Sequence, residues 1–146
     1  MPLQAERIIN GTFGELWLDG DKVAECYGLD AKIEFDKEDV NVCGKLGTDT
    51  KFMGYKGSGS VKLHKVNSRM MLKLSEQIKN GVNPRLQILS ALKDPAAYGS
   101  ERILIKDAAF NDITLAAWEA KQKGTVEAPF TFTDWELLDT IEPKEA

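Results

Sequence analysis

The chain has 146 residues, of which 42% are hydrophobic and 29% charged, and its net charge is −4 at pH 7. This length and apolar content suit one domain with a single core, and the sequence has no apolar run of about 18 residues and no secretion signal. A mildly acidic balance argues against a dedicated nucleic-acid-binding protein. We therefore expect a single domain over residues 1–146, without a membrane anchor, made in a cytoplasm.

Charge is unevenly distributed along the chain. Residues 1–44 carry ten acidic and four basic side chains, whereas residues 45–65 carry five lysines and one aspartate. Such a split suits complementary contacts between copies of the chain. A solvated lysine-rich loop explains it equally well.

The first third of the chain predicts a hairpin and one unusually long strand. Asp19-Gly20 after Leu16-Trp17-Leu18 is a strong turn signal. In residues 23–35 one alternating phase is apolar except at Glu25, which predicts a strand with one buried face that would span about 43 Å. Its partner must be of similar length, from this chain or a neighbouring copy, unless a bend at Gly28 divides it into two ordinary strands.

A basic segment and a helix are expected next. Residues 45–60 are rich in glycine and lysine, and they predict a flexible arm that is either a long loop or a weakly paired hairpin. Residues 61–66 alternate as a short strand. Ser68 is a good N-cap and Gly81 a good helix end, so we expect one amphipathic helix at 69–80.

The last third predicts further strands. We expect strands at 85–92 and 101–106, whereas residues 113–118 are compatible with a strand or a short helical turn. In residues 128–138 the apolar positions switch from even to odd numbers near Asp134, which indicates a bulge or bend. The fold class that follows is mainly β with one α-helix, an antiparallel barrel or sandwich.

The sequence contains no convincing catalytic, cofactor-binding or metal-binding group. His64 is the only histidine, so a nucleophile would have no other base, and its short polar strand favours a surface position. Cys26 and Cys43 are too few and too far apart for a zinc site, and we expect them to be buried free thiols. The glycines of residues 54–60 match no phosphate-binding motif. We expect no enzymatic activity.

Four segments of the chain, taken in order, carry a resemblance to a known family. They are Asn10-Gly11-Thr12 with Gly14-Glu15, Trp17 and Asp19-Gly20; Ala31-Lys32-Ile33-Glu34; the basic segment that ends in Lys56-Gly57-Ser58-Gly59-Ser60; and Pro129-Phe130-Thr131-Phe132-Thr133-Asp134-Trp135-Glu136-Leu137-Leu138-Asp139. The chain resembles the tail tube proteins of contractile-tailed phages and of PBSX-type defective prophages, which are similar to the tubes of phage-like bacteriocins. The resemblance covers nearly the whole chain, and the order of the segments and the closing block make it specific.

This resemblance implies a structural virion protein without catalytic residues. Its subunits would form hexameric rings that stack into an inner tail tube, a conduit for DNA in a phage or a membrane-puncturing tube in a bacteriocin-like particle. Expected partners are further copies of the chain, the sheath protein, the tape-measure protein and the baseplate tube initiator. The expected location is the virion tail, after assembly in the bacterial host cytoplasm. The helix at 69–80 would lie on the outside of the strands.

The resemblance also suggests which residues make contacts. The basic arm supplies three candidates for stacking on the next ring, Lys45, Lys51 and Lys56. They would meet an acidic surface formed by residues 1–44, and the arm would become ordered on stacking, because its glycines raise the entropy cost of ordering. Asp30 and Glu34 are candidates to line the lumen, since clustered lysine and arginine would retain passing DNA.

A function of another class is a small-ligand or carbohydrate-binding β module. Its binding platform would be formed by Trp17, Trp118 and Trp135. Such a module would stay monomeric and be stabilised by its ligand, whereas a tube subunit self-associates through unpaired strand edges.

Overall fold

The structure, a computed structural model, describes residues 4–143. Short 3-10 turns at Ala5–Arg7 and Gly11–Phe13 precede the regular elements. These are β1 (Gly14–Leu18), β2 (Asp21–Lys22), β3 (Cys26–Val40), β4 (Asp49–His64), α1 (Arg69–Lys79), β5 (Arg85–Leu92), β6 (Glu101–Phe110), β7 (Thr125–Phe132) and β8 (Asp134–Asp139). The described chain is therefore mainly β with one α-helix, as its sequence predicts.

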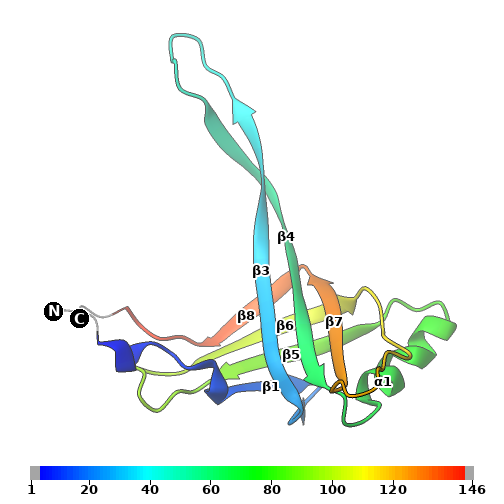
Figure 1. Ribbon diagram of the computed structural model, residues 1–146. Coiled ribbons are helices and arrows are strands. Elements are labelled where there is room, and N and C mark those ends of the chain that lie inside the picture. Colours follow the sequence, from blue (N-terminus) through cyan, green and yellow to red (C-terminus); the bar gives the residue numbers. More distant parts are fainter. Residues whose placement is uncertain (1–3, 144–146) are drawn as a thin grey trace.

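The strands form one antiparallel sheet that curls around a single core (Figure 1). Their order is β2-β1-β5-β6-β7-β4-β3, and β8 pairs with β6. β1, which lies next to the short end strand β2, approaches β3 at the other end of the order without pairing with it, so the sheet does not close and is sandwich-like. The predicted fold class is confirmed in this open form.

The core lies inside the curled sheet and is covered at one end by α1. Phe130, Leu16 and Ile88 are among its fully buried side chains, each of which contributes about 1.5–3 kcal/mol by leaving water. From α1, Met70 and Leu74 reach this core. The helix begins after Ser68, as predicted. The Ser68 side chain makes no cap hydrogen bond, and the side-chain oxygen of Asn67 instead accepts a hydrogen bond from the Arg69 N–H.

The hairpin turn at Asp19-Gly20 is present, with φ angles of 49° and 87° that suit a type I′ turn. Its second strand, β2, has only two residues, and the long strand begins three residues later than expected, at Cys26. A bulge at Tyr27 shifts the register, so Cys26 rather than Tyr27 packs against the core. From Gly28 onwards, Leu29 and Ile33 of the predicted buried phase pack against the core, whereas Ala31 and Phe35 are exposed.

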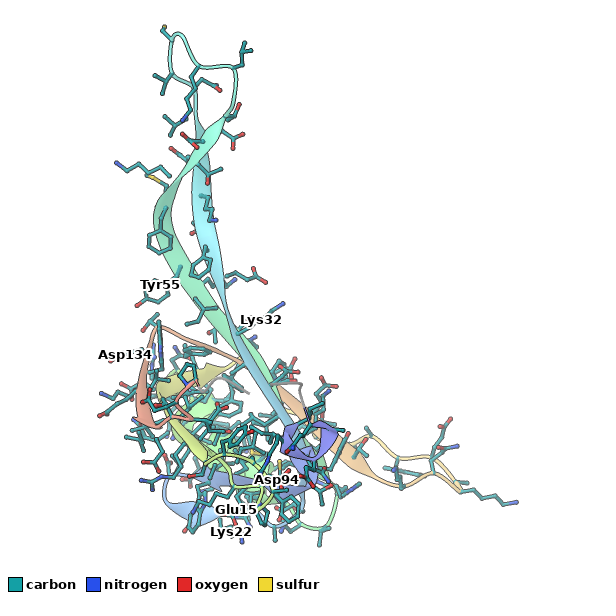
Figure 2. The ribbon with its side chains drawn as sticks, turned by 90° about the vertical axis from the view of Figure 1, so that its left-hand side faces the viewer. Glu15, Lys22, Lys32, Tyr55, Asp94 and Asp134 are labelled. Carbon is teal, nitrogen blue, oxygen red and sulfur yellow. The ribbon has the colours of Figure 1, made fainter. Side chains whose placement is uncertain are left out.

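The partner of the long strand is in the same chain. β3 pairs with β4 from Cys26 opposite Leu63 to Val40 opposite Asp49, and Gly28 does not divide the strand. Only residues 57–64 of β4 also pair with β7, so the rest of the hairpin projects far from the body (Figures 1 and 2). We call this projection, residues 34–56 with the turn 41–48 at its tip, the arm. Of the two alternatives for residues 45–60, a long loop is wrong and a hairpin is observed.

Two further segments bear on the later sections. Residues 111–124 form neither a strand nor a helix but an irregular loop that protrudes from the body (Figure 2). At Thr133 the chain bends from β7, which pairs with β4, into β8, which pairs with β6. This confirms the switch expected near Asp134.

Candidate assembly interface

One face of the arm is charged. In the antiparallel register Glu34 lies opposite Lys56, and Glu38 lies opposite Lys51. A second bulge, at Met53, adds one residue to β4, and this extra residue brings Lys51 and Lys56 to the same face. All four charged side chains are exposed.

The opposite face of the arm is aromatic. Phe35, Phe52 and Tyr55 are 63%, 54% and 46% exposed, and the rings of Phe35 and Phe52 meet edge to face at 5.6 Å between centroids. An exposed apolar patch of this kind is typical of a protein interface. Sequence reasoning missed it because the bulge at Met53 breaks the alternation between Phe52 and Tyr55. The sequence signal that could have predicted this patch is the presence of three aromatic residues in segments that are otherwise poor in apolar side chains.

The three lysines predicted to stack on the next ring do not form one basic cluster. Lys45 lies in the turn at the tip, with its Nζ 2.6 Å from the Asp49 carboxylate, whereas Lys51 and Lys56 lie lower, on the charged face. Each lysine therefore has an acidic residue of its own chain beside it or across the strand pair. The lysine-rich segment is not the separate positive surface that its composition suggests.

The two candidate lumen residues lie on the same face of β3. Asp30 accepts hydrogen bonds from the Ser60 N–H at 3.1 Å and the Ser60 hydroxyl at 3.4 Å, so its carboxylate supports the pairing of β3 with β4. Glu34 is 3.2 Å from the Nζ of Lys32. This face points away from the core. Leu29, whose side chain lies on the other face of β3, packs against the core.

Aromatic rings attach the arm to the body. The ring of Tyr55 meets Trp135 edge to face at 5.5 Å between centroids, and Trp135 meets Phe132 in the same manner at 6.3 Å. Beneath them, a Cβ on Gly57 would lie 2.6 Å from the Phe132 ring, so the strand needs glycine there for close approach. Figure 2 shows Tyr55 on the side of Asp134, the first residue of β8.

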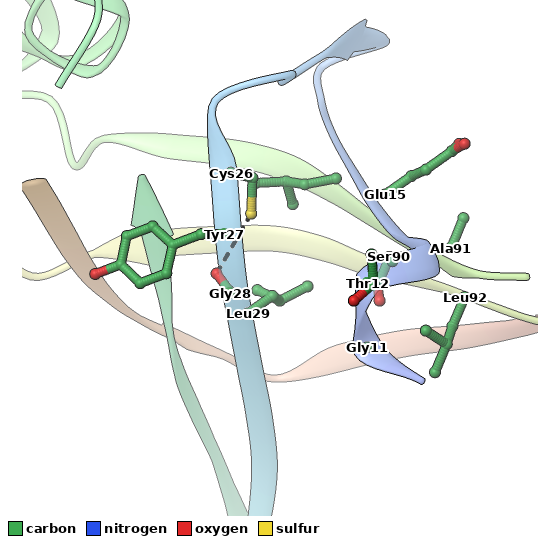
Figure 3. A pocket seen from close by; sticks show the side chains of 12 residues that line it. Gly11, Thr12, Glu15, Cys26, Tyr27, Gly28, Leu29, Ser90, Ala91 and Leu92 are labelled. Atoms are coloured by element: carbon green, nitrogen blue, oxygen red, sulfur yellow. Dashed lines mark hydrogen bonds between the residues drawn. The ribbon is translucent and has the colours of Figure 1, made fainter. Parts of the chain in front are cut away.

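A cleft of about 520 Å³ separates the edges of β1 and β3 (Figure 3). Thr12, Glu15, Cys26 and Ser90 are among its lining residues. Burial raises the pKa of the Cys26 thiol, and its Sγ donates a hydrogen bond to the Gly28 carbonyl oxygen. A protonated thiol is a poor nucleophile, and the lining described here supplies no histidine as a base.

The remaining candidates from the sequence are dispersed. Trp17 and Trp135 lie on strands that are separated by β5 and β6, and Trp118 lies in the loop 111–124, so they do not form a shared platform. His64 is exposed and stacks on Tyr27 with 4.6 Å between ring centroids. Cys43 is exposed near the tip of the arm, which corrects the expectation that both thiols are buried.

Residues 4–143 contain no group of three or more His, Cys, Asp and Glu side chains placed to hold a metal ion. Within the same range, no helix has the length and apolar character needed to span a membrane.

An open sheet with a long unpaired edge and a projecting arm defines a subunit that completes its contacts in an assembly. The family model for the phage tail tube protein matches residues 1–139, and the chain belongs to this family. It is therefore a structural protein of a phage or phage-like tail and not an enzyme.

Relatives and solved structures agree with this assignment. The chain is 31% identical over 143 residues to the phage-like element PBSX protein XkdM of Bacillus subtilis strain 168, with 97% of each chain covered. Its fold is similar to that of a chain in the anti-feeding prophage cap, with a TM-score of 0.71, 11% identity, and 96% and 95% of the two chains covered. A chain in the sheath–tube complex of an extracellular contractile injection system gives a TM-score of 0.70, 11% identity, and 93% and 95% coverage. The resemblance seen in the sequence is confirmed.

Proposed function

We propose that the chain forms hexameric rings that stack into the inner tube of a contractile tail or tail-like particle. The observation that carries the proposal is the outer edge of β3. This strand has 15 residues and, among the described strands, pairs only with β4. Its free N–H and C=O groups would be satisfied by a strand of the next copy. A head-to-tail contact of this kind closes into a ring when its rotation suits.

The arm supplies the second interface that stacked rings require. It carries exposed aromatic side chains on one face and paired charges on the other, which suits contact with the ring above. The part of the arm beyond Tyr55 would stay mobile in the free subunit and become ordered on stacking. The contractile sheath, the baseplate tube initiator and the tape-measure protein are the proposed partners beyond the ring, in a virion tail assembled in the host cytoplasm.

We infer that the lumen is lined by the part of this charged face nearest the body, whereas the charges further out on the arm meet the next ring. Asp30, Lys32 and Glu34 lie on that part, so the channel wall would be polar with mixed charge. Such a wall would let DNA pass without holding its phosphates.

Negative-stain electron microscopy of the concentrated protein tests the proposal. Six-fold rings and tubes of uniform width are expected, with assembly that rises with concentration and is promoted by a tube initiator. Strict monomers up to millimolar concentration, even with an initiator present, would overturn it.

A further inference from the structure

The loop 111–124 presents apolar side chains that the functions above do not use. Trp118 is 88% exposed and Leu115 is 69% exposed, and they are three positions apart. Large apolar side chains grouped on a protruding segment are typical of an interface. In Figure 2 the loop extends away from the body on the side opposite to Asp134 and the start of β8.

The composition of this loop favours a conformation that it does not have here. Residues 115–123 are almost all strong helix formers, and Glu119 with Lys123 has the favourable spacing and order for a helical ion pair. In the single chain only one turn forms, with a 3.3 Å hydrogen bond from the Gln122 N–H to the Glu119 carbonyl oxygen, and Lys121 has a left-handed φ of 62°. A helix this short is unstable without packing. The segment therefore has the character of one that folds on a partner.

β8 on the opposite side has matching properties. It pairs only with β6 among the described strands, so one of its edges is free. Leu137 and Leu138 are 58% and 38% exposed. Two of the three acidic residues of the strand, Glu136 and Asp139, are already ion-paired with Lys106 and Arg102 of the same chain, so charge is not what distinguishes β8.

We propose that the loop 111–124 of one copy packs against β8 of the next copy in the same ring, with Trp118 and Leu115 on Leu137 and Leu138. This inference rests on the proposed ring. A head-to-tail contact needs two different, complementary patches on opposite sides of the subunit, and the loop and β8 satisfy this in position and apolar character. On docking, the loop becomes helical.

The first test is the double variant Trp118→Ala/Leu115→Ala. Both side chains are exposed, so the variant keeps the parental melting temperature, while the concentration needed for ring formation rises at least tenfold by sedimentation. Leu72→Ala is the matched control, because Leu72 is 79% exposed on α1 and belongs to neither of the two patches. Parental ring formation by the double variant would overturn the contact.

The second test is a covalent one in a Cys43→Ser background. Lys121→Cys combined with Glu136→Cys gives, on oxidation, a ladder of linked subunits that ends at the ring number, whereas Lys79→Cys with Glu136→Cys gives no ladder. If the parent forms rings but no ladder appears, only the loop contact is overturned. If the parent forms no rings, the proposed function fails and the loop contact fails with it.

Discussion

The hydroxyl group of Tyr55 donates a 2.8 Å hydrogen bond to the main-chain carbonyl oxygen of Thr133. Tyr55 lies at the base of the arm, and Thr133 is the bend between β7 and β8. The bond therefore connects the arm to the bend between β7, which pairs with β4, and β8, which pairs with β6. Together with the contact between the rings of Tyr55 and Trp135, it holds the arm at its angle to the body.

Replacing Tyr55 by phenylalanine separates this bond from the ring contact. A neutral hydrogen bond contributes about 0.5–1.5 kcal/mol, and Tyr55 is 46% exposed, so we expect a loss near the lower limit and an almost unchanged melting temperature. The amides of residues 49–55 should exchange faster with solvent, as measured by hydrogen–deuterium exchange. Tyr55→Ala, which also removes the ring, should accelerate exchange further. Parental exchange rates in Tyr55→Phe would show that the bond does not restrain the arm.

The glycines of β4 give a second prediction. A Cβ on Gly59 would collide with the carbonyl oxygen of Asp30 and would lie 2.8 Å from the ring of Phe130, so Gly59→Ala must displace β3 or the ring. We expect a loss of about 1–3 kcal/mol in the free energy of unfolding, measured with denaturant. Gly54→Ala is the control in the same strand, because its Cβ would meet only a carboxylate oxygen of Asp36 at 3.9 Å. Equal stability of the two variants would contradict this account.

These glycines also show where the sequence is an incomplete guide to the fold. Alternation identified Leu29 and Ile33, which pack against the core, but Tyr27 and Phe35 of the same predicted phase are exposed. The sequence underestimates the extent of β4, because glycines such as Gly57 and Gly59 are typical of flexible segments. In the structure they accommodate the rings of Phe132 and Phe130, and aromatic cover of this kind compensates for glycine in a strand. The covering strand, β7, is distant in the chain, so local composition does not reveal it.

The candidate surfaces were predictable only in part. The sequence identified Lys51 and Lys56 as arm residues. That they share one face depends on the bulge at Met53, and the sequence analysis did not predict this bulge. Helix propensity favours a regular element around Trp118, yet Trp118 and Leu115 stay exposed in the single chain and so gain no packing energy there. In both cases pairing or packing with distant residues decides the result.

A buried ion pair makes stability depend on pH. The Nε of Arg69 is 2.9 Å from Oε1 of Glu25, and these side chains are 24% and 8% exposed. Burial raises the pKa of Glu25, but its hydrogen bonds, above all the one from Arg69, and the Arg69 charge together outweigh burial and leave the pKa below the usual 4.5. A carboxyl group with a lowered folded-state pKa stabilises the protein above its unfolded-state pKa, and this stabilisation is lost as the pH falls through the folded value.

Glu25→Gln should therefore be less stable than the parent at neutral pH, by about 1–3 kcal/mol, because the guanidinium loses a charged partner. The difference should shrink as the pH falls below 4.5, because the carboxyl group is then protonated in the unfolded parent before it is protonated in the folded one. Denaturant unfolding of both proteins from neutral to acidic pH measures it. Glu34→Gln, at an exposed pair, should follow the parent throughout. A gap that stays constant with pH would exclude the ionised pair as its cause.

Reversing the charge of both arm lysines would not separate an effect on stacking from an effect on folding. Changing Lys51 and Lys56 to glutamate would place like charges opposite Glu38 and Glu34, and such pairs destabilise a sheet, so lost tubes would not isolate the stacking contact.

The exchange variant Lys51→Glu/Glu38→Lys avoids this difficulty, because it keeps opposite charges across the strand pair and reverses only what the arm presents to the next ring. Melting temperature and ring formation should equal those of the parent. An exposed pair contributes only about 0.2–1 kcal/mol, but the contact is repeated in every subunit of a stacked tube. We expect shorter tubes, with the largest effect at low salt, where surface charges are least screened. Tube lengths counted by electron microscopy across a salt series measure the effect. Tubes of parental length at low salt would show that these charges contribute to pairing within the hairpin and not to ring stacking.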